Sequence, residues 1–239
     1  MRNHLKNLSV HYQGDYNKIK WALEHKVDVP NYEVMCDYVC IGEKYYPKAL
    51  YELTNPPFVL YFRGNIDILN KNCISIVGSR DPSIYAIKCT KKLVENLRED
   101  YCIVSGIARG IDRVAHEVAL DFSTVAVLGF GVDVIYPKEN QDIFNRMYHS
   151  QCVISEYPPG TKPLQHHFPN RNRIIAALGQ SLYVMSAKLR SGTMHTVNAA
   201  LRLNKHIICL PHPIDDESGA GCNQLILEGA DILTSLDKV

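Results

Sequence analysis

Residues 157–214 contain no aspartate or glutamate, although the whole chain has 25 of these acids. The stretch has a formal charge of +7 whereas the chain of 239 residues has +1, which leaves −6 for the remainder. A concentrated positive field favours binding of a polyanion, and a near-neutral total limits unspecific attraction elsewhere. Alternatively, part of the stretch is a buried region in which acids are disfavoured. The seven cations are Lys162, Arg171, Arg173, Lys188, Arg190, Arg202 and Lys205.

Long apolar runs are also missing. No run reaches eighteen residues, which excludes a membrane-spanning helix. The first residues, Met1–Lys6, lead into a polar stretch rather than the apolar core of a signal peptide. We therefore expect a cytoplasmic protein with no membrane partner.

Paired cysteine motifs are absent as well. None of the eight cysteines forms a C-x-x-C pair, and Cys36 with Cys40 cannot supply four metal ligands. The adjacent His166 and His167 are poorly placed to ligate one ion. The sequence predicts reduced, mostly buried cysteines and no metal site.

From about Lys71 onward, short β-branched runs alternate with helical patterns. Continuous apolar runs separated by helices are typical of a parallel sheet covered on both faces. We predict an α/β fold with a doubly wound, mostly parallel sheet whose post-strand loops share one edge. The runs are 74–77, 102–104, 124–128, 152–154, 182–185 and 206–210.

The beginning of the chain has a different pattern. A weak helical pattern of Ile19, Leu23 and Val27 ends near Pro30. We expect residues 1–45 to be a helical N-terminal extension and residues 46–239 to be the α/β domain. A strand over 58–62 is predicted to precede the alternating units.

Gly78, Ser79 and Arg80 end one predicted strand and lead into a helix. Glycine allows a ligand to approach the backbone closely, and the N–H groups of a helix N-terminus favour an anion. The planar guanidinium of Arg80 suits phosphate. We expect this loop to contact a phosphate group.

The next post-strand loop, residues 105–112, is more specific. Ser105, Gly106 and Arg109 lie in a narrow turn that would let a ribose or phosphate reach the backbone. Asp112 is expected to have a structural role, either capping the following helix or binding a neighbouring loop. His116 is expected to be packed or solvent-facing rather than catalytic.

The segment Phe168–Arg173 combines one aromatic ring, two guanidiniums and two amides. Single-stranded nucleic acid binding uses this mixture of base stacking and phosphate contacts. We predict that Phe168, Arg171, Asn172 and Arg173 contact such a strand just before a helix that begins near Ile174. The alternative is a core Phe168 with arginines paired to carboxylates.

Lys188 follows the next predicted strand, and Ser191, Gly192 and Thr193 open a helix that also includes Thr196. Thr193 and Thr196 lie one turn apart, so both hydroxyls can face one ligand. The sequence predicts a second anion-binding loop here.

Familiar cofactor motifs are incomplete. Gly129 and Gly131 begin a G-x-G-x-x-G pattern, but Val134 replaces the third glycine, and no Walker A motif is present. No nucleophile is paired with a base that a carboxylate orients. We expect no cofactor and no catalytic residues.

In their order and spacing, these motifs resemble those of the DprA/Smf family, the DNA-processing proteins of bacterial natural transformation. The resemblance runs from about Tyr45 to Asp231. The motifs that carry it are Tyr46-Pro47, Pro56-Pro57, Arg63-Gly64-Asn65, Gly78-Ser79-Arg80, residues 105–112, Tyr136-Pro137 with Asn140, residues 168–175, Ser191-Gly192-Thr193, and Gly221 with Asn223, Leu225-Ile226 and Gly229-Ala230.

The resemblance implies an extended Rossmann-like domain that binds single-stranded DNA in a basic pocket. It also implies a homodimer that protects incoming strands and helps to load the recombinase RecA onto them. The pocket residues that it implies are Gly78, Ser79, Arg80, Ser105, Gly106, Arg171, Asn172, Arg173, Ser191, Gly192 and Thr193.

Three positions depart from the family pattern. Ser186 replaces a glutamate, His212 replaces the glycine of a Pro-Gly pair, and Ala86 replaces a glycine. Two other functions therefore stay open. One is a binding protein for a small nucleotide, and the other is a phosphoribohydrolase-like enzyme on a similar fold, although its P-G-G-x-G-T-x-x-E signature is missing.

Overall fold

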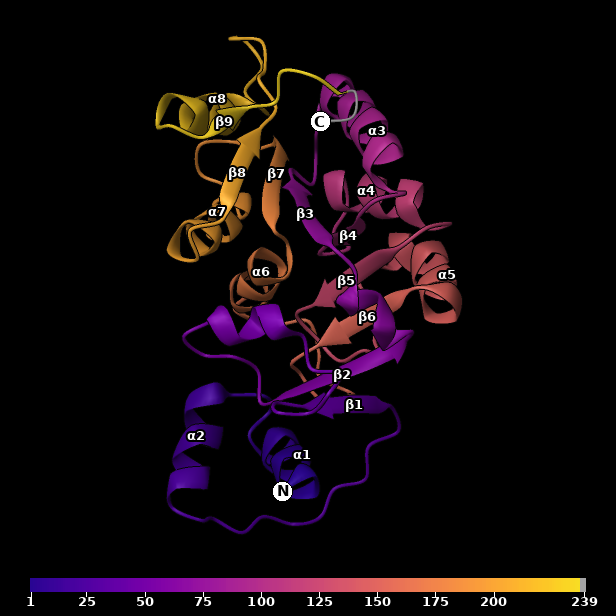
Figure 1. The fold of residues 1–239 in the computed structure, drawn as a ribbon, viewed down its shortest axis with the longest axis vertical. Helices are drawn as coiled ribbons and strands as arrows, with labels where there is room; N and C mark the ends of the chain where they lie inside the picture. The colour runs from indigo at the N-terminus through magenta and orange to yellow at the C-terminus, as the bar shows by residue number, and fades with distance from the viewer. Residues whose placement is uncertain (237–239) are drawn as a thin grey trace.

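A nine-stranded sheet forms the centre of the computed structural model, which describes residues 1–236 (Figure 1). The strand order is β1-β2-β6-β5-β4-β3-β7-β8-β9. All pairs from β6 to β9 are parallel, whereas β2 pairs antiparallel with β1 and β6. The predicted mostly parallel, doubly wound sheet is confirmed. The strands are β1 (Asp37–Cys40), β2 (Val59–Gly64), β3 (Cys73–Gly78), β4 (Cys102–Ser105), β5 (Thr124–Leu128), β6 (Cys152–Ser155), β7 (Ser181–Ser186), β8 (His206–Cys209) and β9 (Asp231–Ile232).

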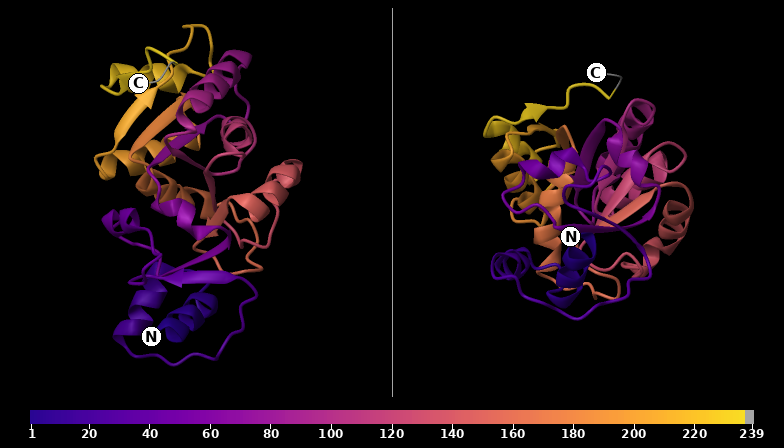
Figure 2. Two further views of the ribbon diagram at one scale, coloured as in Figure 1. Left: turned by 45° about the vertical axis from the view of Figure 1, so that its right-hand side comes forward. Right: turned by 60° about the horizontal axis from the view of Figure 1, so that its bottom comes forward.

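Helices cover both faces of the sheet (Figures 1 and 2). α3 (Ile84–Leu97), α4 (Ile111–Ala119) and α5 (Gln141–Ser150) lie on one face. α6 (His167–Leu178), α7 (Thr193–Arg202) and α8 (Ala220–Leu227) lie on the other, where they share one apolar cluster. Within residues 1–236, no helix combines the length and the apolar character needed to cross a membrane.

The sequence patterns explain these elements. All five residues of β5 are buried because helices cover both faces of the strand. The buried side chains of α3 recur at helical spacing, and the Ser83 hydroxyl accepts a hydrogen bond from the Ala86 N–H at 3.4 Å. All eight cysteines are free thiols, and all except Cys36 are buried, as predicted.

The first part of the chain contributes two helices and one strand. α1 (Arg2–His11) and α2 (Tyr16–Glu24) lie beyond the β1–β2 end of the sheet (Figure 1). α2 ends before Val27, because Lys26 adopts a positive φ of 51°. Strand β1 continues the sheet by pairing with β2. The division of the chain at residues 45 and 46 stays a prediction.

The start of α6 differs from the prediction. The helix begins at His167 rather than near Ile174, so Phe168–Arg173 lie within its first two turns. Pro169 is compatible with this position, since the N–H groups of the first helical turn have no partner inside the helix. The side chains of this segment therefore follow helical spacing instead of lying along a loop.

Within residues 1–236, three short 3₁₀ helices complete the fold, namely η1 (Lys48–Glu52), η2 (Ile66–Asn70) and η3 (Lys138–Asn140).

Candidate functional site

A cavity of about 660 Å³ lies at the carboxyl ends of β3 and β7. β3 pairs with β4 on one side and with β7 on the other, so this is where the strand order reverses. Ligands of open α/β sheets bind at such a crevice. The predicted residues that line it are Gly78, Ser79, Arg80, Phe168, Arg171, Asn172, Lys188, Ser191, Gly192, Thr193 and Thr196.

A second cavity, of about 450 Å³, lies between the loops that follow β4 and β5. Its lining includes Gly106, Arg109, Tyr136 and Lys138. Five residues line both cavities, so the two form one continuous groove, which we call the loop-edge groove. The shared residues are Arg80, Ala108, Tyr136, Phe168 and Arg171.

Arg80 is the exposed cation at the centre of this groove. Its guanidinium carbon lies 5.7 Å from the centroid of the Phe168 ring. This contact leaves the N–H donors of Arg80 available to a ligand. The preceding Ser79 accepts a hydrogen bond from the Asp81 N–H at 3.0 Å, which fixes the turn into α3.

The loop after β4 is held by its own contacts. The buried Ser105 hydroxyl donates to the Ile76 carbonyl at 2.6 Å, so Ser105 does not line the groove. Asp112 accepts a hydrogen bond from the Ala108 N–H at 3.3 Å, so it holds its own loop and neither caps α4 nor binds a neighbouring loop as predicted. Burial raises the pKa of the Asp112 carboxyl, and the nearby Arg171 opposes this shift.

Arg171 is a buried cation at the floor of the groove, with 4% of its surface exposed. Its Nη1 donates to the carbonyls of Gly106, at 2.8 Å, and Val127. A Cβ at Gly106 would lie 2.5 Å from that nitrogen, so the glycine makes room for the guanidinium. Burial lowers the pKa of Arg171 to about 10, which leaves it charged at neutral pH.

Arg173 points in another direction. Its Nη2 lies 2.6 Å from Oε2 of Glu156, and Arg173 lines neither cavity. Phe168, Arg171 and Asn172 share one face of α6 because they are three and four residues apart, whereas Arg173 lies off that face. The structure therefore does not bring Arg173 and Ser105 together with the other predicted residues.

The loop after β7 forms the opposite wall. Lys188 is exposed, and the buried Oγ of Ser191 has no hydrogen-bond partner within residues 1–236. Gly192 is the N-cap residue of α7, and because glycine has no side chain it cannot cap the helix N-terminus. Thr193 and Thr196 follow on the first turn and line the groove together. These groups can donate hydrogen bonds to an anion.

The charges of the groove are mostly positive. Its cations are Arg80, Arg109, Lys138, Arg171 and Lys188, and its acids are Asp112 and Glu139. Within residues 1–236, none of these cations forms a salt bridge. Two cations of the acid-free stretch are instead neutralised from outside it, by Glu156 on Arg173 and by Glu52 on Lys205 at 2.9 Å.

Sequence reasoning missed the wall formed by Tyr136 and Lys138. These residues follow the Gly129–Gly131 turn after β5, and that post-strand position was the available signal. His195 also lines the groove. Within residues 1–236, no three histidine, cysteine or acidic side chains are grouped to hold a metal ion.

Comparison with known proteins identifies relatives of this chain. Residues 37–239 match the family model described as DNA recombination-mediator protein A. The chain is 41% identical to the DNA processing protein DprA of Streptococcus pneumoniae over 192 residues, which are 80% of this chain and 68% of that protein. It is 39% identical to the protein Smf of Synechocystis over 234 residues, 95% of this chain but only 57% of that protein.

Solved structures agree with the sequence comparison. The X-ray structure of DprA from Streptococcus pneumoniae matches with a TM-score of 0.85 and 32% identity, covering 97% of this chain and 93% of that one. DNA processing protein A from Helicobacter pylori, whose structure concerns its mode of binding single-stranded DNA, matches with a TM-score of 0.78 and 30% identity. This second match covers 84% of this chain and 93% of the other.

Proposed function

Because the chain belongs to the DNA recombination-mediator protein A family, we propose that it binds single-stranded DNA in the loop-edge groove and acts in recombination during natural transformation. The observation that carries this proposal is the groove itself, where four exposed cations without salt bridges surround aromatic rings. A single strand offers both phosphates and unstacked bases to such a surface.

We propose that different residues of the groove contact the phosphates and the bases of the strand. Arg80 and Lys188 are placed to contact phosphates, together with the Ser191 hydroxyl and the N-terminus of α7. Phe168 and the 42% exposed Tyr136 present ring faces on which bases stack. The buried Arg171 adds positive charge from below while its hydrogen bonds hold the loop after β4 in place.

The proposal also covers partners and activity. We infer a cytoplasmic homodimer that protects the bound strand and helps to load RecA onto it, as the family resemblance implies. The protein acts by binding rather than by catalysis, because the His195 ring forms no hydrogen bond to a serine or threonine hydroxyl of the groove within residues 1–236.

The test is fluorescence anisotropy with a labelled oligo-thymidine and a matched duplex. Wild type is expected to prefer the single strand, and Arg80→Ala is expected to weaken binding about tenfold for every sequence, since a phosphate contact carries no base information. Arg146→Ala serves as the control, because Arg146 lies on α5 in an exposed pair with Asp121. Equal affinity for both DNA forms would contradict the proposal. In that case, mononucleotide binding and release of free base would be measured to test the two other functions.

A further inference from the structure

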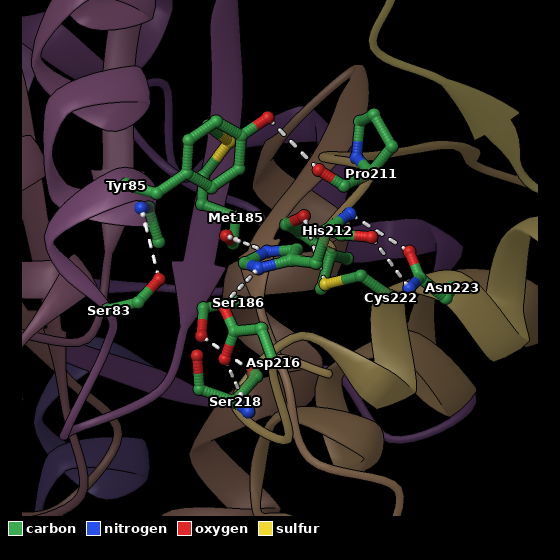
Figure 3. Close-up of polar contacts among 12 residues, drawn as sticks. Ser83, Tyr85, Met185, Ser186, Pro211, His212, Asp216, Ser218, Cys222 and Asn223 are labelled. Atoms are coloured by element: carbon green, nitrogen blue, oxygen red, sulfur yellow. Dashed lines mark hydrogen bonds and ion pairs between the residues drawn. The ribbon is translucent and has the colours of Figure 1, made fainter. Parts of the chain in front are cut away.

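The loop between β8 and α8, residues 211–219, is fastened by a buried histidine. The His212 side chain has no exposed surface. Its main-chain N–H donates to the Asn223 side chain at 2.9 Å, and its carbonyl accepts from the same amide at 3.0 Å (Figure 3). A Cβ on Gly219 would lie 1.8 Å from the His212 ring, so the loop closes tightly around the imidazole.

Both ring nitrogens of His212 face oxygen acceptors. Nδ1 lies 3.0 Å from Oδ2 of Asp216, and Nε2 lies 3.1 Å from the Met185 carbonyl (Figure 3). Hydrogen bonds from Ser218 and from His212 hold the pKa of the Asp216 carboxyl well below its usual range, so this carboxylate accepts and does not donate. A neutral imidazole has one N–H and can satisfy only one of the two oxygens. An imidazolium, which has two N–H groups, would satisfy both oxygens.

The same loop joins two walls of the loop-edge groove. On one side, Met185 and Ser186 are the last residues of β7, and Ser186 lies two positions before Lys188. The Ser186 hydroxyl donates to the Ser218 carbonyl at 2.8 Å. On the other side, the Tyr85 hydroxyl of α3 donates to the Pro211 carbonyl at 3.1 Å. Tyr85 lies shortly after Arg80, and its ring meets the His212 ring edge-on at 5.5 Å.

We propose that His212 is a positioning residue that acts in the imidazolium form. The ring ties the β8–α8 loop to the end of β7 and to Asp216, and this loop sets the spacing between the Arg80 wall and the Lys188 wall. This inference rests on the proposed function of the groove. When pH rises and the ring loses a proton, one nitrogen presents a lone pair to an oxygen, so one of the two hydrogen bonds of the ring is lost. The loop is then held less firmly, and DNA affinity falls.

The other polar groups around the ring come from the loop itself, α3, α8 and β7. Asp216 is the facing carboxylate of the loop itself. α3 contributes the Tyr85 phenol, whose pKa is raised by burial, and α8 contributes Asn223 and Cys222. Burial raises the pKa of the Cys222 thiol to about 12. β7 contributes only the neutral Met185 carbonyl and Ser186 hydroxyl.

The first arm of the test is independent of DNA. Nitrogen-15 NMR of histidine-labelled protein is recorded between about pH 5 and 9, and the His212 signals are identified by their loss in His212→Gln. The expected result is protonation of both ring nitrogens at the acidic end. The protection of the amides in residues 211–219, measured as the ratio of the intrinsic to the observed exchange rate at each pH, should fall at the pH where one proton leaves. A ring with one bare nitrogen throughout, or exchange that ignores its protonation, would overturn the proposal even if the groove binds DNA.

The second arm measures oligo-thymidine affinity over the same pH range. Wild type is expected to lose about fivefold more affinity on alkalinisation than His212→Gln, a size typical of coupling between two sites. His195 lies in the groove of both proteins, so its titration cancels in this comparison. His206→Gln is the matched control, because His206 is exposed at the beginning of β8. Identical pH profiles for wild type and His212→Gln would refute the link to the groove, whereas absent DNA binding by every variant would refute the proposed function alone.

Discussion

At the scale of residues, α6 shows how two identical side chains acquire different surroundings. Arg171 and Arg173 are two positions apart, a rotation of about 200° around the helix axis. Arg171 therefore lies under the loop-edge groove, and Arg173 reaches Glu156. From the sequence, a loop over these residues allowed both arginines to face one ligand. Only the helical start at His167 separates them.

The first prediction concerns the contribution of the Arg173–Glu156 salt bridge to stability. The two side chains are 14% and 6% exposed, and burial is the main cause that raises the pKa of Glu156. Arg173→Ala should lower the free energy of unfolding by about 3–5 kcal/mol, because it leaves a buried carboxylate uncompensated. Urea denaturation measures this loss. The double variant Arg173→Met/Glu156→Leu should recover most of the stability, and a double variant as unstable as Arg173→Ala would contradict the explanation.

The second prediction concerns how His116 makes the stability of the protein depend on pH. The His116 ring has no exposed surface, and its Nδ1 shares a hydrogen bond with the Thr124 hydroxyl at 2.7 Å. Burial lowers the pKa of His116 to about 3. The unfolded chain, with an ordinary value of about 6.5, binds a proton that the folded protein excludes. Stability should therefore fall on acidification from about pH 6.5, by about 2 kcal/mol at pH 5.

The measurement is urea denaturation of wild type and His116→Gln at pH 7 and pH 5. The variant keeps a polar side chain but cannot take up this proton. It should lose about 2 kcal/mol less than wild type on acidification. Equal losses in the two proteins would show that His116 does not contribute.

At the scale of elements, the loop between β4 and α4 depends on its contact with the loop after β3. Gly110 has a φ of 75°, and a Cβ there would lie 2.3 Å from the Ser79 carbonyl oxygen. The Ser79 carbonyl also accepts the Ile111 N–H at 3.1 Å. The two loops therefore support each other, and the groove residues Arg80 and Arg109 depend on that packing for their placement.

Gly110→Ala is expected to destabilise the protein by roughly 2–4 kcal/mol, from both the positive φ and the backbone clash. Gly192→Ala is the matched control for stability, since a Cβ at Gly192 meets nothing within 4 Å and its φ is −60°. Thermal unfolding of both variants tests the difference. Similar melting temperatures for the two would contradict this account of the loop.

The helices and strands also show how much of the fold could be predicted from the sequence. The apolar runs predicted β3 to β8 and their common edge, because buried parallel strands have a strong pattern. The antiparallel pairing of β2 with β6 was not predictable, since it joins segments far apart in the chain. The predicted helix start near Ile174 was wrong, because α6 begins at His167 and its first turn tolerates Pro169. Gly78, Ser79, Arg80 and Lys188 line the first cavity and were predicted from their positions after strands, and the post-strand position of Tyr136 was a signal of the same kind that was not used.

At the scale of the whole molecule, charge is segregated although the total is +1. Two cations of the acid-free stretch that lie away from the groove, Arg173 and Lys205, form salt bridges with carboxylates from other segments. The groove cations Arg80 and Lys188 form no salt bridge within residues 1–236. Positive charge without a salt-bridge partner is therefore present at the edge of the sheet where the groove lies.

This distribution predicts a salt dependence. The logarithm of the oligo-thymidine association constant should fall linearly with the logarithm of salt concentration, by about 0.7 for each phosphate neutralised. Arg80→Ala should reduce that slope by about 0.7, and Arg146→Ala should leave it unchanged. Anisotropy titrations at several salt concentrations measure the slopes. An unaltered slope in Arg80→Ala would remove Arg80 from the set of phosphate contacts.

The strand order has a consequence for protein synthesis. The Arg80 wall follows β3, and the Lys188 wall follows β7, which pairs beside β3 only after the ribosome has released β4, β5 and β6. A nascent chain that ends at β6 possesses half of the groove and lacks the α7 N-terminus. The groove is thus completed late in translation, and the growing polypeptide lacks the proposed DNA-binding surface until β7 and α7 have emerged and docked.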